Sequence, residues 1–245
     1  MQEIIYTQDG SPTLLNIEFN ESYHSVKCGA LLESLEKHTK PVFGFKEKYG
    51  KKIRILDVCF GLGYNAFCAL LYAEQNNLSV EIISPEIDES LLANILEFNY
   101  PKEFEPLKPI FYNLAHNKEA IYGNSSIKIM IGDLRKTLPS IDGNFDAVFQ
   151  DPFSPKNNTT LWSIEYFKEL RSKMPNFGVI TTYSCSSAVR LTMQEAGFFV
   201  YYLPLKAPLR SGTIASTQEL VGYEKIDLEH KKKTNIDLKS ISDFI

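Results

Sequence analysis

The sequence of 245 residues predicts an α/β fold in which helices cover both faces of a mostly parallel sheet. Three observations support this prediction. Short apolar runs alternate with helical patterns along most of the chain, residues 53–58 are apolar enough to be buried on both faces, and two glycines follow them closely. Because parallel strands need crossover connections, usually helices, the alternation favours a single Rossmann-like sheet of seven strands.

The N-terminal segment is expected to add a small extension, residues 1–45, to this sheet. Strands at 2–8 and 13–19 flank Asp9-Gly10-Ser11-Pro12, a sequence typical of a hairpin turn. A helix at 29–39 is expected to follow the hairpin.

The main domain is expected to span residues 46–225, and a polar tail with three consecutive lysines to span 226–245. The expected strands are 53–58, 79–84, 127–131, 145–149 and 178–183, followed by an antiparallel pair at 198–203 and 217–223. The expected helices are 66–73, 88–98, 110–122 and 186–196. The last helix should end at Gly197, because glycine is favoured just past a helix end.

The composition argues against several classes of protein. With 26 Lys and Arg residues against 30 Asp and Glu, the net charge is −4, so only a local patch can attract nucleic acid. The four cysteines lie far apart and lack the spacing of metal ligands, which predicts reduced thiols and no metal site. The N-terminus has neither a basic start nor a long apolar stretch, and a cytoplasmic protein without a membrane span is expected.

The turn after residues 53–58 carries the features of a nucleoside-cofactor site. Gly61 and Gly63 let the backbone turn sharply and approach a ligand, but the third glycine of the dinucleotide fingerprint is missing. This pattern favours S-adenosylmethionine, which has no phosphate. Asp57 is placed to hold the ammonium of that donor, and Glu86, about 20 residues past the turn, is placed to accept from the ribose hydroxyls. The alternative is a tight strand-to-helix turn with Glu86 at a helix start.

Two further acids follow the next strands. Asp133, after Gly132, is placed to accept from the adenine amino group, or alternatively to cap a helix. Asp151 opens the loop Asp-Pro-Phe-Ser-Pro, whose two prolines restrict the backbone and can hold a carboxylate still. In that position Asp151 can receive a proton from an amine or orient its lone pair, unless it only caps a helix.

Basic and aromatic residues provide candidate contacts to a larger substrate. Four basic side chains are expected on the same face as the acids and can contact a phosphate backbone, namely Lys156, Arg190, Lys206 and Arg210. Each of them can equally be an ordinary surface residue. Phe153, Trp162 and Tyr183 are candidates for stacking on a base, with burial in the core as the alternative, and Tyr23 precedes a turn that can fold over the cofactor.

Several segments together resemble the methyltransferase domain of the tRNA wobble-uridine modification enzyme MnmC. The resemblance runs from about residue 6 to 222 and includes the signature Phe60-Gly-x-Gly-x-Asn65. The other segments that carry it are 21–25, 29–34, 146–155, 161–162 and 190–198.

The resemblance implies a class I S-adenosylmethionine-dependent methyltransferase that acts on a tRNA anticodon loop. Its product would be 5-methylaminomethyl-(2-thio)uridine, made by methylation of the aminomethyl nitrogen on C5 of the wobble uridine. By the same resemblance the glycine signature from Phe60 to Asn65 and Glu86 hold the donor, and Asp151 faces the amine. No FAD-dependent oxidase domain is expected in this chain, so the aminomethyl group is expected to come from another route.

One departure from the family pattern concerns the acceptor loop. The family has Asp-Gly-Phe-Ala-Pro where this chain has proline at 152, which stiffens the backbone and removes an N–H. Two other functions stay open at this point. The loop also resembles the Asp-Pro-Pro-Tyr loop of enzymes that methylate amino groups of other bases or protein amides, and a non-catalytic module that binds S-adenosylmethionine or RNA is the third possibility.

Overall fold

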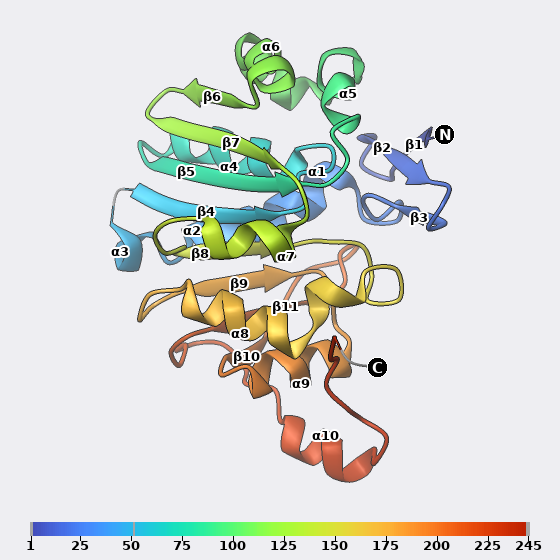
Figure 1. Cartoon of the computed structure of the whole chain (residues 1–245), viewed down its shortest axis with the longest axis vertical. Coiled ribbons are helices and arrows are strands. Elements are labelled where there is room, and N and C mark those ends of the chain that lie inside the picture. Colours follow the sequence, from blue (N-terminus) through green and yellow to red (C-terminus); the bar gives the residue numbers. More distant parts are fainter. Residues whose placement is uncertain (1, 51, 244–245) are drawn as a thin grey trace.

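The computed structural model describes residues 2–50 and 52–243 and confirms the α/β fold with a mostly parallel sheet (Figure 1). Its main sheet has the strand order β10-β11-β9-β8-β4-β5-β7-β6. Met1, Lys51, Phe244 and Ile245 lie outside the described residues, among them the outer ends of the predicted extension and tail.

The five central strands are parallel, β6 and β11 pair antiparallel with β7 and β9, and β10 pairs antiparallel with β11. The central strands are β4 (Lys52–Val58), β5 (Ser79–Glu86), β7 (Ser125–Ile131), β8 (Ala147–Gln150) and β9 (Val179–Thr182), and the outer ones are β6 (Glu119–Tyr122), β10 (Phe199–Leu203) and β11 (Gly212–Ser216). The chain runs from β4 through β5 to β7 and then returns to place β8 on the other side of β4. The strand order therefore reverses between β4 and β8, where ligands bind in open parallel sheets.

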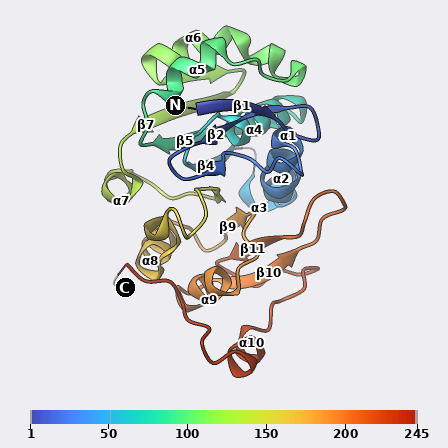
Figure 2. The ribbon, with the colours of Figure 1, turned by 90° about the vertical axis from the view of Figure 1, so that its right-hand side faces the viewer.

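Helices cover both faces of the sheet (Figures 1 and 2). One face carries α1 (Ala30–Glu33), α2 (Lys40–Phe43) and α4 (Tyr64–Gln75), and the other carries α7 (Leu134–Thr137) and α8 (Ile164–Ser172). The remaining helices are α3 (Lys46–Tyr49), α5 (Leu91–Glu97), α6 (Lys108–Asn117), α9 (Ser187–Glu195), α10 (Leu228–Thr234) and the short η2 (Lys102–Leu107), η3 (Leu138–Ser140) and η4 (Thr159–Trp162). Two large apolar clusters, one on each face of the sheet, hold β4, β5 and β8 in place, so these strands end at the same edge.

A second, three-stranded sheet is built by the N-terminal segment and lies over the ends of the central strands (Figure 2). It consists of β1 (Gln2–Tyr6), β2 (Pro12–Asn16) and β3 (Glu21–Ser22). The hydroxyl of Tyr64 on α4 donates to the Pro12 carbonyl over 2.7 Å and anchors this sheet on the main domain.

The predicted helix at 29–39 extends to Phe43 and contains a π-helical stretch, η1 (Ser34–Thr39), between α1 and α2. Pro41 lies two residues past the end of this stretch, and it has no N–H to donate to the carbonyl four residues earlier. A π-helical turn redirects side chains relative to a regular helix, and such turns occur often at functional sites. Here it sets the direction of His38.

The structure differs from the predicted elements at two edges of the sheet. The main sheet has eight strands rather than seven, because Lys118 takes a left-handed conformation (φ 63°) that ends α6 and lets β6 pair with β7. The final strand is β11 at 212–216 rather than 217–223, since the buried run Gly-Thr-Ile-Ala-Ser fits between two strands better than the polar residues that follow.

The C-terminal segment packs on the domain instead of forming a plain polar tail. Leu228 at the start of α10 is buried, and the backbone of Ile241 accepts a hydrogen bond from Ile164. Asp243 forms a bidentate pair with Arg135 at 2.7 and 2.9 Å. The helix α8, which this segment contacts, was not predicted from the sequence.

Candidate active site

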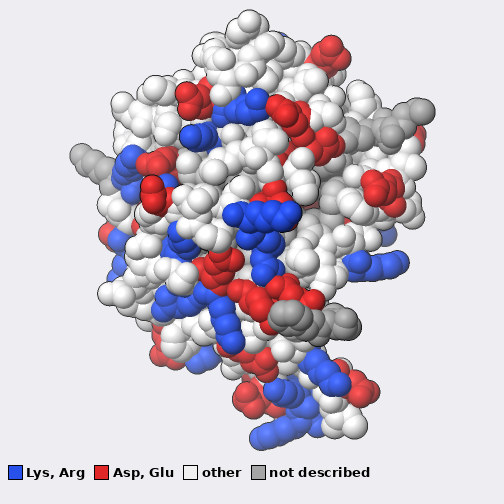
Figure 3. Space-filling view, viewed as in Figure 1, with Lys and Arg blue, Asp and Glu red and all other residues white. Residues whose placement is uncertain are grey.

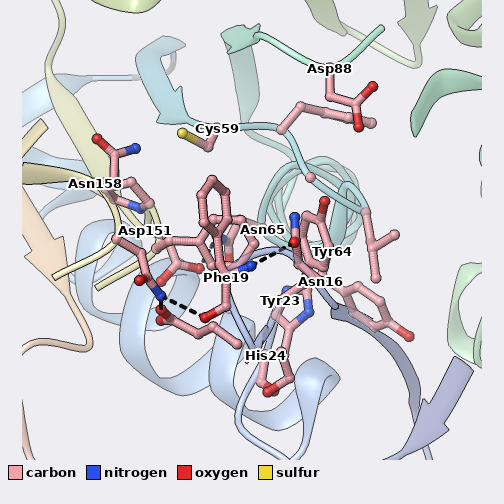
Figure 4. A pocket seen from close by; sticks show the side chains of 18 of the residues that line it. Asn16, Phe19, Tyr23, His24, Cys59, Tyr64, Asn65, Asp88, Asp151 and Asn158 are labelled. Atoms are coloured by element: carbon pink, nitrogen blue, oxygen red, sulfur yellow. Dashed lines mark hydrogen bonds between the residues drawn. The ribbon is translucent and has the colours of Figure 1, made fainter. Parts of the chain in front are cut away.

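A cavity of about 740 Å³ lies beyond the ends of β4, β5 and β8, beneath the N-terminal sheet (Figure 4). Side chains from far-apart segments face it. Phe19, Tyr23 and His24 come from the N-terminal segment, whereas Cys59 and Asp151 follow strands of the main sheet. The cavity thus lies at the point where the strand order reverses.

The glycine turn forms one wall of the cavity. Gly61 (φ 55°) and Gly63 (φ 77°) both take left-handed conformations that glycine adopts without a steric penalty. A Cβ at Gly63 would lie 2.7 Å from the Phe60 ring and 2.8 Å from the Phe67 ring. Gly61 lines the cavity, and its N–H donates to Glu86 over 2.8 Å.

Cys59 also lines the cavity, in a left-handed conformation (φ 68°) that is uncommon for a residue with a side chain. Burial raises the pKa of its thiol well above the usual range, so the side chain stays neutral. The cysteine spacing predicted only a reduced thiol at this position.

Glu86 and Asp57 occupy neighbouring strand ends in different surroundings. Glu86 lines the cavity and accepts from the N–H groups of Gly61 and Asp88, while burial raises the pKa of its carboxyl. Asp57 is 0% exposed and is not in the cavity wall. One of its oxygens accepts from the Ser84 hydroxyl over 2.8 Å, the other has no partner among the described residues, and burial raises the pKa of the carboxyl to about 8.

Asp151 is held on two sides. Its Oδ2 accepts from the Asn65 amide over 2.8 Å, and its Oδ1 lies 3.6 Å from Nε2 of His38. Burial by itself would raise the pKa of this carboxyl, but the nearby His38, His24 and Asn65 outweigh it and hold the pKa below its ordinary value. Asp151 is therefore a fixed, ionised carboxylate in the cavity wall.

The loop that carries Asp151 is fastened to its surroundings through backbone atoms. Tyr183 donates from its hydroxyl to the Pro152 carbonyl over 3.0 Å, and Trp162 donates from its indole to the Phe153 carbonyl over 2.8 Å. The carboxylate of Glu21 accepts from both the N–H and the hydroxyl of Ser154. Because Glu21 belongs to β3, these hydrogen bonds join the N-terminal sheet to this loop.

The aromatic candidates divide into a cavity residue and core residues. Phe153 lines the cavity with its ring centroid 5.3 Å from that of Phe19 and 5.0 Å from that of Tyr23. Trp162 is fully buried in the core, and Tyr183 reaches the cavity only in part. The cluster of Phe19, Tyr23 and Phe153, here called the aromatic cluster, lines the cavity next to Asp151.

Several predicted site residues lie outside the cavity. Asp133 caps α7 by accepting from the Arg135 N–H over 3.0 Å, which is the alternative role considered for it. Arg190, predicted to contact tRNA, is only 3% exposed and donates to Thr213 and to the Gly212 carbonyl, so its guanidinium has no access to an RNA backbone. Lys156, Lys206 and Arg210 are exposed side chains that do not line the cavity.

The charge of the cavity wall is strongly one-sided. Among the described residues that line it there is no Lys or Arg, whereas six carboxylates do so: Glu18, Glu21, Glu33, Glu86, Asp88 and Asp151. A wall of this kind favours cationic ligands. Glu18 and Glu21 could not be assigned from sequence spacing because they reach the site only through docking of the N-terminal sheet.

S-adenosylmethionine fits these residues. The donor carries a sulfonium and an ammonium, both cations, and the wall offers carboxylates together with Asn65, one of whose buried side-chain atoms has no partner. The exposed apolar side chain of Ile87, 72% exposed beside Glu86, offers a flat contact for an adenine ring. No group of three or more metal-ligating side chains occurs among residues 2–50 and 52–243, and none of their helices is long and apolar enough to cross a membrane.

Comparison with known proteins gives one consistent result. A family model described as S-adenosyl-L-methionine-dependent methyltransferase matches residues 102–218. The crystal structure of MnmC2 from Aquifex aeolicus is 35% identical with a TM-score of 0.79, and the match covers 95% of this chain and 75% of that one.

Two relatives are longer than this chain. An uncharacterised protein of Methanocaldococcus jannaschii is 35% identical over 201 residues, which cover 80% of this chain and 54% of the relative. The tRNA 5-methylaminomethyl-2-thiouridine biosynthesis bifunctional protein MnmC of Pseudomonas syringae is 25% identical over 227 residues, which cover 82% of this chain and 32% of the relative. The chain thus spans about half and about a third of their lengths. It belongs to the MnmC-type family of S-adenosyl-L-methionine-dependent methyltransferases.

Proposed function

We propose that the protein methylates a primary amine on tRNA, the aminomethyl nitrogen on C5 of the wobble uridine. The observation that carries this proposal is the fixed and ionised Asp151 in a cavity whose described lining residues include six carboxylates and no Lys or Arg. Such a wall attracts an ammonium group and repels phosphate, so the amine enters the cavity and the RNA backbone stays outside.

The donor side of the cavity is assigned to the glycine turn and its neighbours. Glu86 is placed to exchange its hydrogen bonds with Gly61 and Asp88 for bonds from the ribose hydroxyls. Asp57 lies behind the cavity wall and would reach the donor ammonium through water, since one of its buried oxygens has no partner among the described residues. When bound, S-adenosylmethionine supplies a methyl group that is already activated by the positive charge on sulfur.

Asp151 acts on the acceptor side. An ionised carboxylate binds the acceptor as an ammonium and fixes the nitrogen opposite the reacting methyl group. The hydrogen bond from Asn65 and the stiff loop around Pro152 keep the carboxylate in place during this step. A carboxylate with a lowered pKa is also a weak base, so the proton of the ammonium needs a further acceptor.

Recognition of the RNA is assigned to the rim. A base turned out of the anticodon loop would stack on the aromatic cluster, and such stacking contributes about 1–3 kcal/mol per base. Lys156, Lys206 and Arg210 are exposed and available to phosphates. Basic and acidic side chains mix on the face shown in Figure 3. The helix α10 carries Lys231, Lys232 and Lys233 in its last turn.

Labelled methyl transfer in vitro tests the proposal. The purified protein is incubated with labelled S-adenosylmethionine and either tRNA that carries 5-aminomethyl-2-thiouridine, the same tRNA without the aminomethyl group, duplex DNA or bulk protein. We expect label only in the first, recovered by nucleoside mass spectrometry as 5-methylaminomethyl-2-thiouridine. Label in DNA or protein would instead favour the Asp-Pro-Pro-Tyr type of amino-group methylation, and no label in any of them would favour a binding module.

A further inference from the structure

His38 lies behind Asp151, on the side that faces away from the cavity. It belongs to the π-helical stretch η1, is 0% exposed, and is not itself in the cavity wall. Its ring packs against the Phe149 ring of β8 at a centroid distance of 5.4 Å. The side chain therefore has a fixed position and no direct contact with a ligand in the cavity.

The two ring nitrogens of His38 have different surroundings. Nδ1 lies 2.9 Å from the hydroxyl oxygen of Thr181 on β9, within hydrogen-bond distance. Nε2 is buried, has no hydrogen-bond partner among the described residues, and faces Asp151 Oδ1 at 3.6 Å. When Nδ1–H donates to Thr181, Nε2 carries a free lone pair directed at the carboxylate.

The charged groups around His38 and Asp151 allow His38 to accept one more proton. Asp151 is the acid next to Nε2, and His24, whose pKa is lowered by burial, is the other imidazole close to Asp151. Glu33, on the same helical segment, is already paired with Lys37 at 2.5 Å. Of the groups that face Asp151, His38 is thus the buried base that can gain a positive charge beside a carboxylate.

The chemistry of amine methylation requires such a base. A primary alkyl ammonium, like that of lysine, has a pKa of about 10.4 and cannot attack until it loses a proton. Asp151 favours the charged ammonium and cannot store the proton at neutral pH, since its own pKa is lowered. An imidazole beside a carboxylate can take up this proton, because the negative charge stabilises the imidazolium.

We propose that His38 accepts, through Asp151, the proton that the acceptor amine must lose. In this step an N–H bond of the ammonium breaks and an Nε2–H bond forms, while the carboxylate passes the proton and ends unchanged. The nitrogen lone pair then forms the N–C bond as the C–S bond breaks and sulfur keeps the electron pair. The proton on His38 leaves to solvent after product release. This inference rests on the proposed amine acceptor.

The test compares pH–rate profiles of single-turnover transfer to tRNA that carries 5-aminomethyl-2-thiouridine. His38→Gln keeps an amide near the position of Nε2 that can hydrogen-bond Asp151 but cannot take a proton. We expect about 100-fold slower transfer than wild type at pH 7, a rate that rises tenfold per pH unit, and a rate within about threefold of wild type near pH 9. Thr181→Val, which removes the partner of Nδ1, should give a smaller loss of the same shape.

Melting temperature and calorimetric donor binding, measured on both variants, show that fold and cofactor site are kept. A loss of equal size at every pH would mean that His38 only supports Asp151 structurally, and it would overturn the inference. So would a profile like that of the wild type. If the wild-type protein transfers no methyl group, the proposed function and this inference are both overturned. If the wild-type protein is active and a variant shows one of these two contrary profiles, only this inference is overturned.

Discussion

Replacing Asp57 by Asn should stabilise the protein while weakening donor binding. Asp57 is fully buried, one of its oxygens has no partner, and burial raises its pKa from 3.8 to about 8. An acid whose pKa is raised by folding contributes its full stabilisation of the folded chain at pH values below its ordinary pKa. That stabilisation is lost as the pH rises through the folded value, here between about 4 and 8.

The magnitude follows from the size of the shift. A difference of 4.2 units between 8 and 3.8, at about 1.4 kcal/mol per unit, sets a ceiling of about 6 kcal/mol on the free energy of unfolding lost at high pH. Because a folded chain relaxes around a buried charge, we expect a measured gain of about 2–3 kcal/mol for Asp57→Asn at pH 8. Below about pH 4 the gain should vanish. Asn can still accept from Ser84.

Urea unfolding between pH 4 and 8, with the donor absent, measures this difference. The matched control is Asp133→Asn, which removes the same charge from a helix cap that either residue type can form. The stability gain of Asp57→Asn should grow with pH, and calorimetry at pH 7 should show weaker binding of S-adenosylmethionine. A gain that does not depend on pH would refute the raised pKa, and unchanged donor affinity would remove Asp57 from the donor site.

Two further pairs of variants separate local effects. Gly63→Ala should cost about 2–4 kcal/mol in unfolding free energy, because it adds the clash with the Phe60 and Phe67 rings to the left-handed backbone penalty. The control Gly197→Ala (φ 95°, no atom within 4 Å of the added Cβ) should cost about 1–2 kcal/mol, and equal thermal shifts for both would contradict the close packing of the turn. Arg190→Gln should lower stability by about 1–3 kcal/mol with tRNA affinity per folded molecule unchanged, whereas Lys156→Gln should change stability by less than about 0.5 kcal/mol and weaken tRNA binding. The reverse outcome in a filter-binding assay would return Arg190 to the RNA interface.

The sequence predicted the parallel core of the fold because the residues that define each of its strands and turns lie close together in the chain. The run ending at Val58, the glycines after it and the spacing to Glu86 all belong to one strand-turn-helix-strand unit. Strand ends in a parallel sheet meet at one edge, so acids that follow them gather there. Asp133 is the exception, since its side chain satisfies the backbone N–H of its own helix.

Contacts between distant segments could not be predicted in this way. Glu21 reaches Ser154, and His38 reaches Thr181, across more than a hundred residues of chain. Arg190 was expected at the surface because arginine is rarely buried, but stacking on Tyr202 and hydrogen bonds to the Thr213 hydroxyl and the Gly212 carbonyl accommodate it inside. The edge strand β6 forms because Lys118 takes a left-handed conformation, which the residue type lysine does not predict.

The most direct test of the account is Asp151→Asn, measured for donor binding and for methyl transfer on the same preparation. Asn has the shape of Asp and removes only the charge that we assign to the acceptor amine. We expect the calorimetric affinity for S-adenosylmethionine to stay within about threefold of wild type, and single-turnover methyl transfer to 5-aminomethyl-2-thiouridine tRNA to fall at least about 100-fold. Undiminished transfer would contradict the central claim, and a loss of donor binding would move Asp151 into the cofactor site.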